Sequence, residues 1–157
     1  MLLKCRKMLR NEKGLTLIEL LAVVVILGII AAIAIPSIGG LIDNSRKDAH
    51  AANAQQMISS SRVAITGSNE LALGKKYLTL NYLEKNGYIE KVKAPDNKDY
   101  TIGVETLVEN TAPTTGSYVE VTDGKITAVK LISDSITILQ TSSTGTLTIT
   151  RDHVTKN

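Results

Sequence analysis

A single carboxylate stands near the start of a long apolar run. From Leu15 to Ile35 the only clearly polar side chains are those of Thr16 and Glu19. A helix over these residues would be about 30 Å long at about 1.5 Å per residue, which matches the hydrocarbon core of a bilayer. An ionised side chain at that depth costs roughly 2.5–3.5 kcal/mol, so we expect Glu19 to pair with a positive charge.

Few other side chains have the types or the spacing for catalysis or for binding a cofactor. His50 falls on a predicted helix and His153 near the C-terminus, and we expect both at the surface because neither belongs to a metal-ligand pattern. Asp96 and Asp99 lack the dense oxygen ligands that calcium prefers, which favours a plain turn over a calcium site. The sequence predicts no catalytic residue, no metal site and no cofactor.

Positive charge is concentrated before the apolar run. Residues 1–14 hold five basic side chains against one acidic, a net charge of +4, whereas the rest of the chain holds 13 basic and 14 acidic, a net charge of −1. A basic flank keeps its end of an apolar span in the cytoplasm, so we expect the remainder to face outward. The charge balance gives no support for nucleic-acid binding, which needs basic residues clustered on the working domain.

The leader and the apolar run together resemble the processing signal of type IV prepilins and pseudopilins. The matching features are a short basic leader, Gly14, an apolar residue, Thr16-Leu17-Ile18-Glu19 and an apolar stretch up to Pro36. The family most often has Phe where this chain has Leu15. The resemblance covers residues 4 to about 40. It implies that a membrane-embedded prepilin peptidase cuts between Gly14 and Leu15 and methylates the new amino group of Leu15.

The resemblance also supplies a partner for Glu19. The cut would create an α-amine at Leu15, whose intrinsic pKa of about 7.7–8.0 lets it carry a positive charge. In the family's filaments this acid is thought to neutralise the amino terminus of a neighbouring subunit. The alternative is that Glu19 merely occupies the first helical turn, where the helix dipole stabilises a negative charge by about 0.3–1 kcal/mol.

Two other interpretations of the apolar run stay open. Ala32-Ile33-Ala34 has the form of an ordinary signal-peptidase site, although the run is longer than the usual 7–15 apolar residues and contains an acid. A single-pass anchor that never assembles is the second. Cys5 precedes the run, so a chain cut at Gly14 would have no cysteine and no disulfide.

We expect an α+β fold of the pilin type, in which a long N-terminal helix packs on a small antiparallel sheet. The expected divisions are a leader over 1–14 that is removed, a membrane and filament-core helix over 15–36, an amphipathic continuation over 37–67 and a globular head over 68–157. Pro36 should kink or loosen the helix because it removes a backbone donor. Ala51, Ala54, Ile58 and Ile65 recur at helical spacing as a packing stripe.

The head reads as one short helix followed by strands. Gly87 closes a helical turn that begins near Leu80, and Asp123-Gly124 is a hairpin signal between two apolar segments. We expect four or five strands in one antiparallel sheet. The expected strand segments are Tyr100–Val104, Tyr118–Val121, Ile126–Ile132, Ile136–Ile138 and Leu147–Ile149.

Two classes of function follow from the resemblance. One is a structural pilus subunit for adhesion, aggregation or motility, and the other is a pseudopilin of a competence DNA-uptake or type II secretion machine. Both imply a homo-oligomeric helical filament, an assembly ATPase with a membrane platform protein, and minor pilins. DNA binding is expected to be weak, because Tyr77, Tyr82 and Tyr88 near the lysines suit core packing better than base stacking. The missing disulfide fits a Gram-positive source, again by resemblance.

Overall fold

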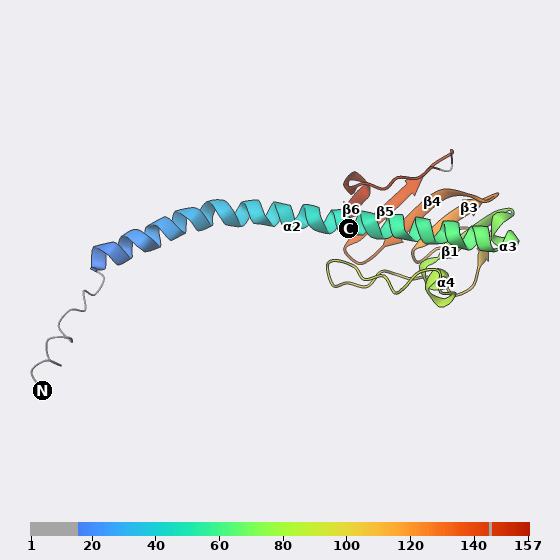
Figure 1. Cartoon of the computed structure of the whole chain (residues 1–157), viewed down its shortest axis with the longest axis horizontal. Helices are drawn as coiled ribbons and strands as arrows, with labels where there is room; N and C mark the ends of the chain where they lie inside the picture. Colours follow the sequence, from blue (N-terminus) through green and yellow to red (C-terminus); the bar gives the residue numbers. More distant parts are fainter. Residues whose placement is uncertain (1–15, 145) are drawn as a thin grey trace, which may run out of the picture. The chain divides into compact units, whose positions relative to one another are not determined.

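The computed structural model describes residues 16–144 and 146–157, which form a long helix and a small α+β head (Figure 1). The chain divides into two units between Leu41 and Ile42, and residues 42–157 are called the head unit below. The helical elements are α2 (Leu17–Gly67), α3 (Asn69–Ala72), α4 (Leu80–Lys85) and the short 3₁₀ helix η1 (Arg151–His153). The strands are β1 (Lys75–Thr79), β2 (Val108–Glu109), β3 (Tyr118–Thr122), β4 (Lys125–Ile132), β5 (Ile136–Thr141) and β6 (Val154–Lys156).

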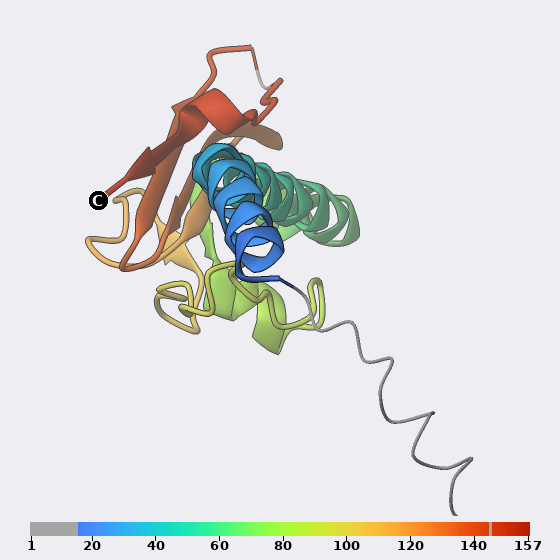
Figure 2. The same ribbon diagram turned by 90° about the vertical axis from the view of Figure 1, so that its left-hand side faces the viewer.

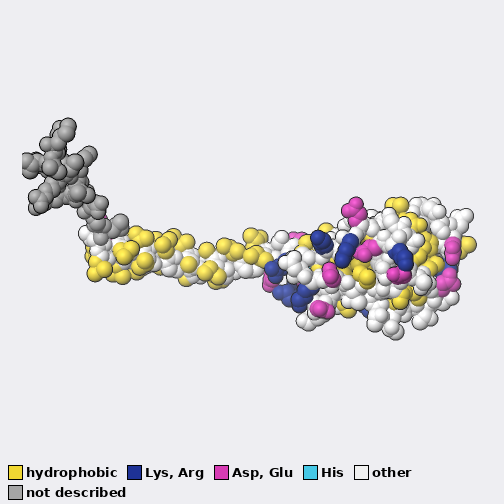
Figure 3. All heavy atoms as spheres, turned by 90° about the horizontal axis from the view of Figure 1, so that it is seen from below, with side chains coloured by type: hydrophobic (Ala, Val, Ile, Leu, Met, Phe, Trp, Pro, Cys, Tyr) yellow, Lys and Arg dark blue, Asp and Glu magenta, His cyan; other side chains and the backbone are white. Residues whose placement is uncertain are grey.

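Helix α2 spans 51 residues, close to the predicted length of about 50, and ends at Gly67 as predicted. Its first half has no packing partner among the described residues: of residues 17–42, all but Ala34 are exposed. An 18-residue window there has a mean hydropathy of 3.0 and none of it is buried. Figure 3 shows this part of the helix covered almost entirely by hydrophobic side chains. By length and composition the helix is able to cross a membrane.

Pro36 lies inside α2, and the helix continues through it and through Gly39 and Gly40. Proline has no amide hydrogen, so the carbonyl four residues earlier, that of Ala32, loses its usual helical donor. A helix that is continuous here therefore still has one missing backbone hydrogen bond near the end of the apolar run.

A six-stranded antiparallel sheet forms the body of the head unit. Its strand order is β2-β1-β3-β4-β5-β6, so the chain runs outward strand by strand from β3 while β1 and β2 add to the other side. The predicted hairpin joins β3 to β4, with Asp123 and Gly124 at φ values of 48° and 74°. Two successive positive φ values suit the right-handed twist of paired strands. Figure 2 shows the part of α2 that belongs to the head unit, from residue 42 onward, on one face of this sheet.

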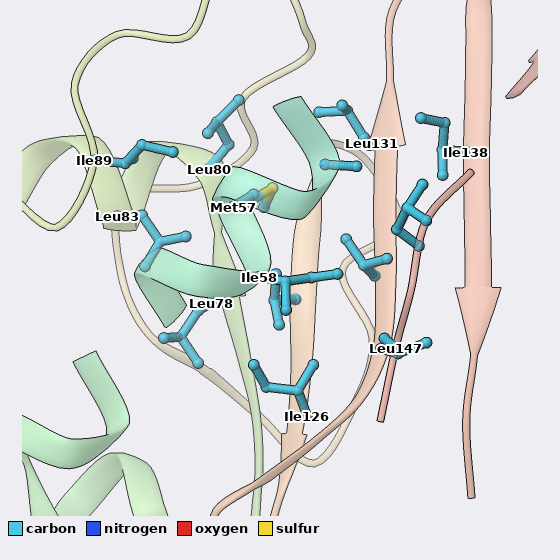
Figure 4. Close-up of a cluster of buried hydrophobic side chains, with 14 of the residues drawn as sticks. Met57, Ile58, Leu78, Leu80, Leu83, Ile89, Ile126, Leu131, Ile138 and Leu147 are labelled. Carbon is cyan, nitrogen blue, oxygen red and sulfur yellow. The ribbon is translucent and has the colours of Figure 1, made fainter. Parts of the chain in front are cut away.

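The core lies between the sheet and the second half of α2. Ala51, Ala54 and Ile58 are buried, which confirms the predicted packing stripe, and Met57 is fully buried with them. Figure 4 shows Met57 and Ile58 surrounded by side chains from α4 and the strands. The cluster includes Leu78, Leu80, Leu83, Ile89, Ile126, Leu131, Ile138 and Leu147. The α+β fold with a helix on an antiparallel sheet is thus as predicted.

Two predicted strands are wrong. The segment from Tyr100 to Val104 forms only one isolated bridge, between Tyr100 and Ser133. Its backbone groups have scattered partners: the amide of Thr101 donates to Ile132, and the carbonyl of Ile102 accepts from Asn81. Gly103, at a φ of +79°, turns the chain out of an extended path.

Leu147 and Ile149 are buried but pair with no strand, and β6 occupies the edge beside β5 instead. The amide of Ile149 donates to the side-chain oxygen of Gln55 on α2, 3.3 Å away. A helix side chain therefore takes the place of a strand partner. Alternation of apolar residues signals burial here but not sheet pairing.

The segment around Gly87 is as predicted. Helix α4 begins after Thr79, whose hydroxyl accepts a hydrogen bond from the amide of Tyr82 at 3.0 Å. Gly87 follows its C-terminal end at a φ of +74°, the left-handed conformation common at helix ends.

Candidate functional site

The acid of the apolar run caps its own helix. The amide and the hydroxyl of Thr16 both donate to Glu19 Oε2, at 2.8 Å and 2.7 Å, and the amide of Glu19 donates back to Thr16 Oγ1 at 3.3 Å. This reciprocal arrangement is a capping box, which satisfies amides that the first helical turn would leave unpaired. Thr16 was not predicted as part of the site, although its spacing from Glu19 is that of the capping-box motif.

The capping box occupies only one carboxylate oxygen of Glu19. Oε1 has no hydrogen-bond partner among the residues that the structure describes. The neighbouring Leu17 and Ile18 are 86% and 74% exposed, so the carboxylate projects from an apolar surface. The arrangement leaves one oxygen able to accept a hydrogen bond from a further cation.

Residues 9–35 match the family model of the prokaryotic N-terminal methylation motif. The chain carries a type IV prepilin-type signal. This match supports the prepilin and pseudopilin family, whose members are structural subunits. Searches of curated proteins and of solved structures gave no match.

The prepilin-type signal includes both residues of the predicted cut. Gly14 and Leu15 lie outside the described residues, so their prediction rests on the sequence and the matched motif. Thr16 and Glu19 both follow the predicted cut. Cleavage between Gly14 and Leu15 would therefore leave the capping box within the mature chain.

A second polar cluster lies in the head unit, and it corrects the prediction for His50. His50 is 2% exposed rather than at the surface. Its Nδ1 lies 2.7 Å from the hydroxyl of Tyr100, and the rings meet edge to face. Asn53 donates its amide hydrogen to the same hydroxyl at 3.0 Å. The cause is that His50 falls on the face of α2 that packs on the head.

These contacts assign the protons. The Tyr100 oxygen accepts from Asn53, and its own hydrogen is free to donate to His50 Nδ1, an arrangement in which the imidazole proton lies on Nε2. Nε2 lies 4.0 Å from Asp96 Oδ2. Burial lowers the pKa of His50, and the nearby Asp96 charge opposes part of that shift. Burial also disfavours the charged form of Tyr100. It raises the pKa of Tyr100 to about 12, so the phenol keeps its hydrogen and remains a donor.

The two aspartates considered for calcium are not brought together. Asp96 accepts from the Ser135 hydroxyl and from the amide of Lys98, and it lines one pocket while Asp99 lines another. Within the described ranges, no group of three or more His, Cys, Asp or Glu side chains is placed to hold a metal. The contacts of Asp96 are those of a turn.

The lysines near β1 are partly neutralised by acids. Lys75 lies 3.2 Å from Glu120, and Lys76 pairs with Glu109. Tyr77 is 2% exposed and meets Tyr118 edge to face, while Tyr82 and Tyr88 pack against the core. All three tyrosines pack as predicted, with Tyr82 and Tyr88 only partly buried.

Proposed function

We propose that this chain is a structural subunit of a type IV pilus filament, serving adhesion, aggregation or motility. The observation that carries the proposal is the matched methylation motif at the start of a helix whose first half is apolar and exposed. An exposed apolar surface of this size needs a lipid or protein partner. A bilayer before assembly and the helices of other subunits afterwards would supply both. We retain the proposed divisions at 1–14, 15–36, 37–67 and 68–157.

Processing is proposed at Gly14 and Leu15. Prepilin peptidase would cut between them and methylate the α-amine of Leu15, and a separate assembly ATPase with a membrane platform protein would drive insertion into the filament. Gly14 has no side chain to obstruct the peptidase. The Gram-positive source has gained no support beyond the absence of cysteine after the leader, and the proposal does not depend on it.

Glu19 is the proposed assembly residue. The cost of placing its carboxylate in an apolar layer is roughly 2.5–3.5 kcal/mol, and the two hydrogen bonds from Thr16 offset part of it. The positively charged amine of a neighbouring Leu15 would complete the pairing through the available Oε1. Leaving one member of such a pair alone costs about 3–5 kcal/mol, so pairing would select the register between subunits.

Pro36 is proposed to give the assembled helix a point of local flexibility. The missing amide leaves the helix one hydrogen bond short at this position. Gly39 and Gly40 follow closely and add low helix propensity. A bend or a local loss of helix would therefore cost least here when subunits pack.

The alternative is a pseudopilin of a competence or type II secretion machine, which would carry the same signal. The two differ in abundance and in the length of the assembly. Surface fibres released by shearing would consist mainly of this chain if it is a major pilus subunit. Fibres that contain little of it would favour the pseudopilin or a minor pilin.

The test combines mass spectrometry with one substitution. Mature protein should begin at an N-methylated Leu15, whereas a start at Ile35, after Ala34, would contradict processing as a prepilin. Glu19→Leu, expressed without the natural chain, should be cut normally and should form no filaments. Normal filaments from that variant would remove the pairing argument while leaving the processing intact.

A further inference from the structure

A basic pocket lies on the head unit beside the residues where α2 joins it. Its volume is about 320 Å³, and both Arg46 and Lys47 line it from α2. Lys98 lines it from the loop after α4, and Lys156 from β6. Figure 3 shows Lys and Arg side chains gathered at the end of the head unit that begins with residue 42. Four cations from three separate parts of the chain thus surround one pocket.

Only part of this charge is neutralised within the pocket. Lys156 forms an ion pair with Asp43 at 2.8 Å. Asp96, the other carboxylate of the lining, accepts from the hydroxyl of Ser135. Arg46, Lys47 and Lys98 have no ion-pair partner within 4.0 Å in the part of the chain that the structure describes.

A buried imidazole forms part of the pocket lining. His50 lines it and is 2% exposed. With Nδ1 accepting from Tyr100, the imidazole is neutral and presents its Nε2 hydrogen toward Asp96. The net charge of the lining is then +2, from four cations and two carboxylates. Such a lining suits an anion with several oxygens.

The pocket lies a short way along α2 from Leu41 and Ile42, the last of the exposed apolar residues in the first half of the helix. Arg46 follows Leu41 by five residues, and Ile42 is the last of the consecutively exposed apolar positions of α2. Five residues span about 7–8 Å as helix and at most about 18 Å when fully extended. The polar headgroup layer of a bilayer is itself about 5–8 Å thick on each side. This distance limit holds for any orientation of the head unit.

We propose that this pocket binds the headgroup phosphate of an anionic phospholipid on the outward leaflet, and so holds the head unit on the membrane before assembly. Arg46 would donate hydrogen bonds to the phosphate oxygens through its planar guanidinium, with Lys47 and Lys98 as point charges. The inference rests on the proposed membrane insertion of residues 15–36. Arg46 follows Pro36 by ten residues, about 15 Å as helix, and the stretch between them is uncharged over residues 37–42. A helix that carries this uncharged stretch into the headgroup layer brings the pocket within reach of the phosphates, which makes lipid the occupant rather than a free anion.

The test uses the full chain inserted into vesicles of phosphatidylcholine alone or of an equimolar mixture with phosphatidylglycerol. A membrane-impermeant reagent acylates exposed lysine amines, and mass spectrometry measures each site. Lys47 and Lys98 should react several-fold more slowly in the anionic vesicles, while Lys91 and Lys125 should change little. Equal slowing at all four lysines, or none at Lys47 and Lys98, would overturn the proposal.

One substitution and its match separate a bound lipid from general attraction to the surface. Each cation near an anionic surface changes the binding constant about fivefold, so Arg46→Gln should remove most of the protection at Lys47 and Lys98. Arg62→Gln, which removes an exposed charge outside the pocket, should leave it. Equal effects of the two variants would count against a defined site.

A last arm distinguishes the source of the phosphate. Inorganic phosphate added to the phosphatidylcholine vesicles should give little protection. Full protection by it would identify a free anion as the occupant and refute the lipid proposal. Resistance of the chain to alkaline extraction from both vesicle types verifies insertion separately, so failure of the proposed membrane role is recognised independently of failure at the pocket.

Discussion

Thr16 and Glu19 lie together at the start of α2. Their geometry allows Glu19 both to cap the helix and to pair with a cation. The capping box satisfies the helix terminus through Glu19 Oε2, while Oε1 is left able to accept from a cation. Capping and pairing between subunits therefore do not compete for the same oxygen. In the proposed function Thr16 acts on assembly through the orientation that it gives to Glu19.

Replacing Thr16 with alanine should weaken assembly without abolishing it. The variant loses the hydroxyl that donates to Glu19 and accepts from its amide, and loss of such an N-cap costs about 0.5–2 kcal/mol. Thr16→Ser keeps the hydroxyl and is the matched control. Filament yield per cell, measured on sheared fibres, should fall in the order natural chain, serine variant, alanine variant and Glu19→Leu. An alanine variant that matches the natural chain would show that the capping box plays no part.

His50 should make the head unit less stable in mild acid. Because its pKa in the folded chain lies below 6.5, the unfolded chain binds the proton first. The contribution of neutral His50 to the free energy of unfolding is fully present above about pH 6.5. It is lost progressively as the pH falls from there toward the pKa of His50 in the folded chain. All five tyrosines belong to the head unit and the chain has no tryptophan, so tyrosine fluorescence during urea unfolding reports this unit alone.

The controls for His50 are two glutamine substitutions. His50→Gln should flatten the loss of stability between about pH 7.5 and about pH 5.5, whereas His153→Gln should retain it. His153 differs in setting, because its Nδ1 contacts Thr150 at the exposed end of η1. A pH dependence that survives His50→Gln would assign it to other groups, of which Asp96 is the nearest.

At the scale of elements, α2 has two halves with different surroundings. Residues 17–42 are exposed apart from Ala34, whereas the second half places Ala54, Met57 and Ile58 against the sheet with no exposure. Apolar side chains of one helix are therefore buried within the chain in its second half and exposed in its first half. The apolar side chains of the second half pack on the sheet of the same chain, and the exposed apolar surface of the first half fits a membrane or neighbouring subunits.

Ile58→Ala should destabilise the head unit by about 2–5 kcal/mol, since it removes a fully buried side chain and leaves a cavity. Val63→Ala on the same helix is the control. Val63 is 62% exposed, so its truncation should change the free energy of unfolding by no more than about 0.5 kcal/mol. Urea unfolding followed by tyrosine fluorescence measures both. Similar losses from the two variants would mean that α2 does not pack on the sheet as described.

At the scale of the whole molecule, an apolar helix and a folded head unit coexist in one chain. The apolar half of α2 fits a membrane-anchored precursor and a surface filament. The head unit has its own core between α2 and six strands. In the proposed function, the head unit faces water while the apolar half of α2 lies in lipid or among other subunits.

The uncut chain should remain in membranes during alkaline carbonate extraction and leave them only with detergent. The double variant Val25→Lys and Ile29→Lys should be released, because each lysine near the centre of a span costs about 2.5–3.5 kcal/mol. Immunoblots of pellet and supernatant provide the measurement. Release of the natural chain by carbonate would contradict membrane insertion.

Much of the fold and of the candidate site could be predicted from local sequence patterns. Gly67 as the end of α2, the stripe through Ala54 and Ile58, and the turn at Asp123-Gly124 depend on backbone preferences and periodicity that neighbouring residues determine. The apolar run with Glu19 predicted the methylation motif that residues 9–35 match. Strand β1 was not predicted, because its five residues, two lysines followed by Tyr77, Leu78 and Thr79, show no alternation of apolar and polar side chains.

The sequence by itself determined which residues form the apolar helix, where the acid lies in it and that a processing signal precedes it, because these features follow from residue types and spacing. Only the tertiary structure decided that His50 is buried against Tyr100, that Ile149 bonds to Gln55 and that Arg46, Lys47 and Lys98 share one pocket. These arrangements join residues far apart in the chain. Their free energy depends on long-range packing, which leaves no periodic signal in the sequence.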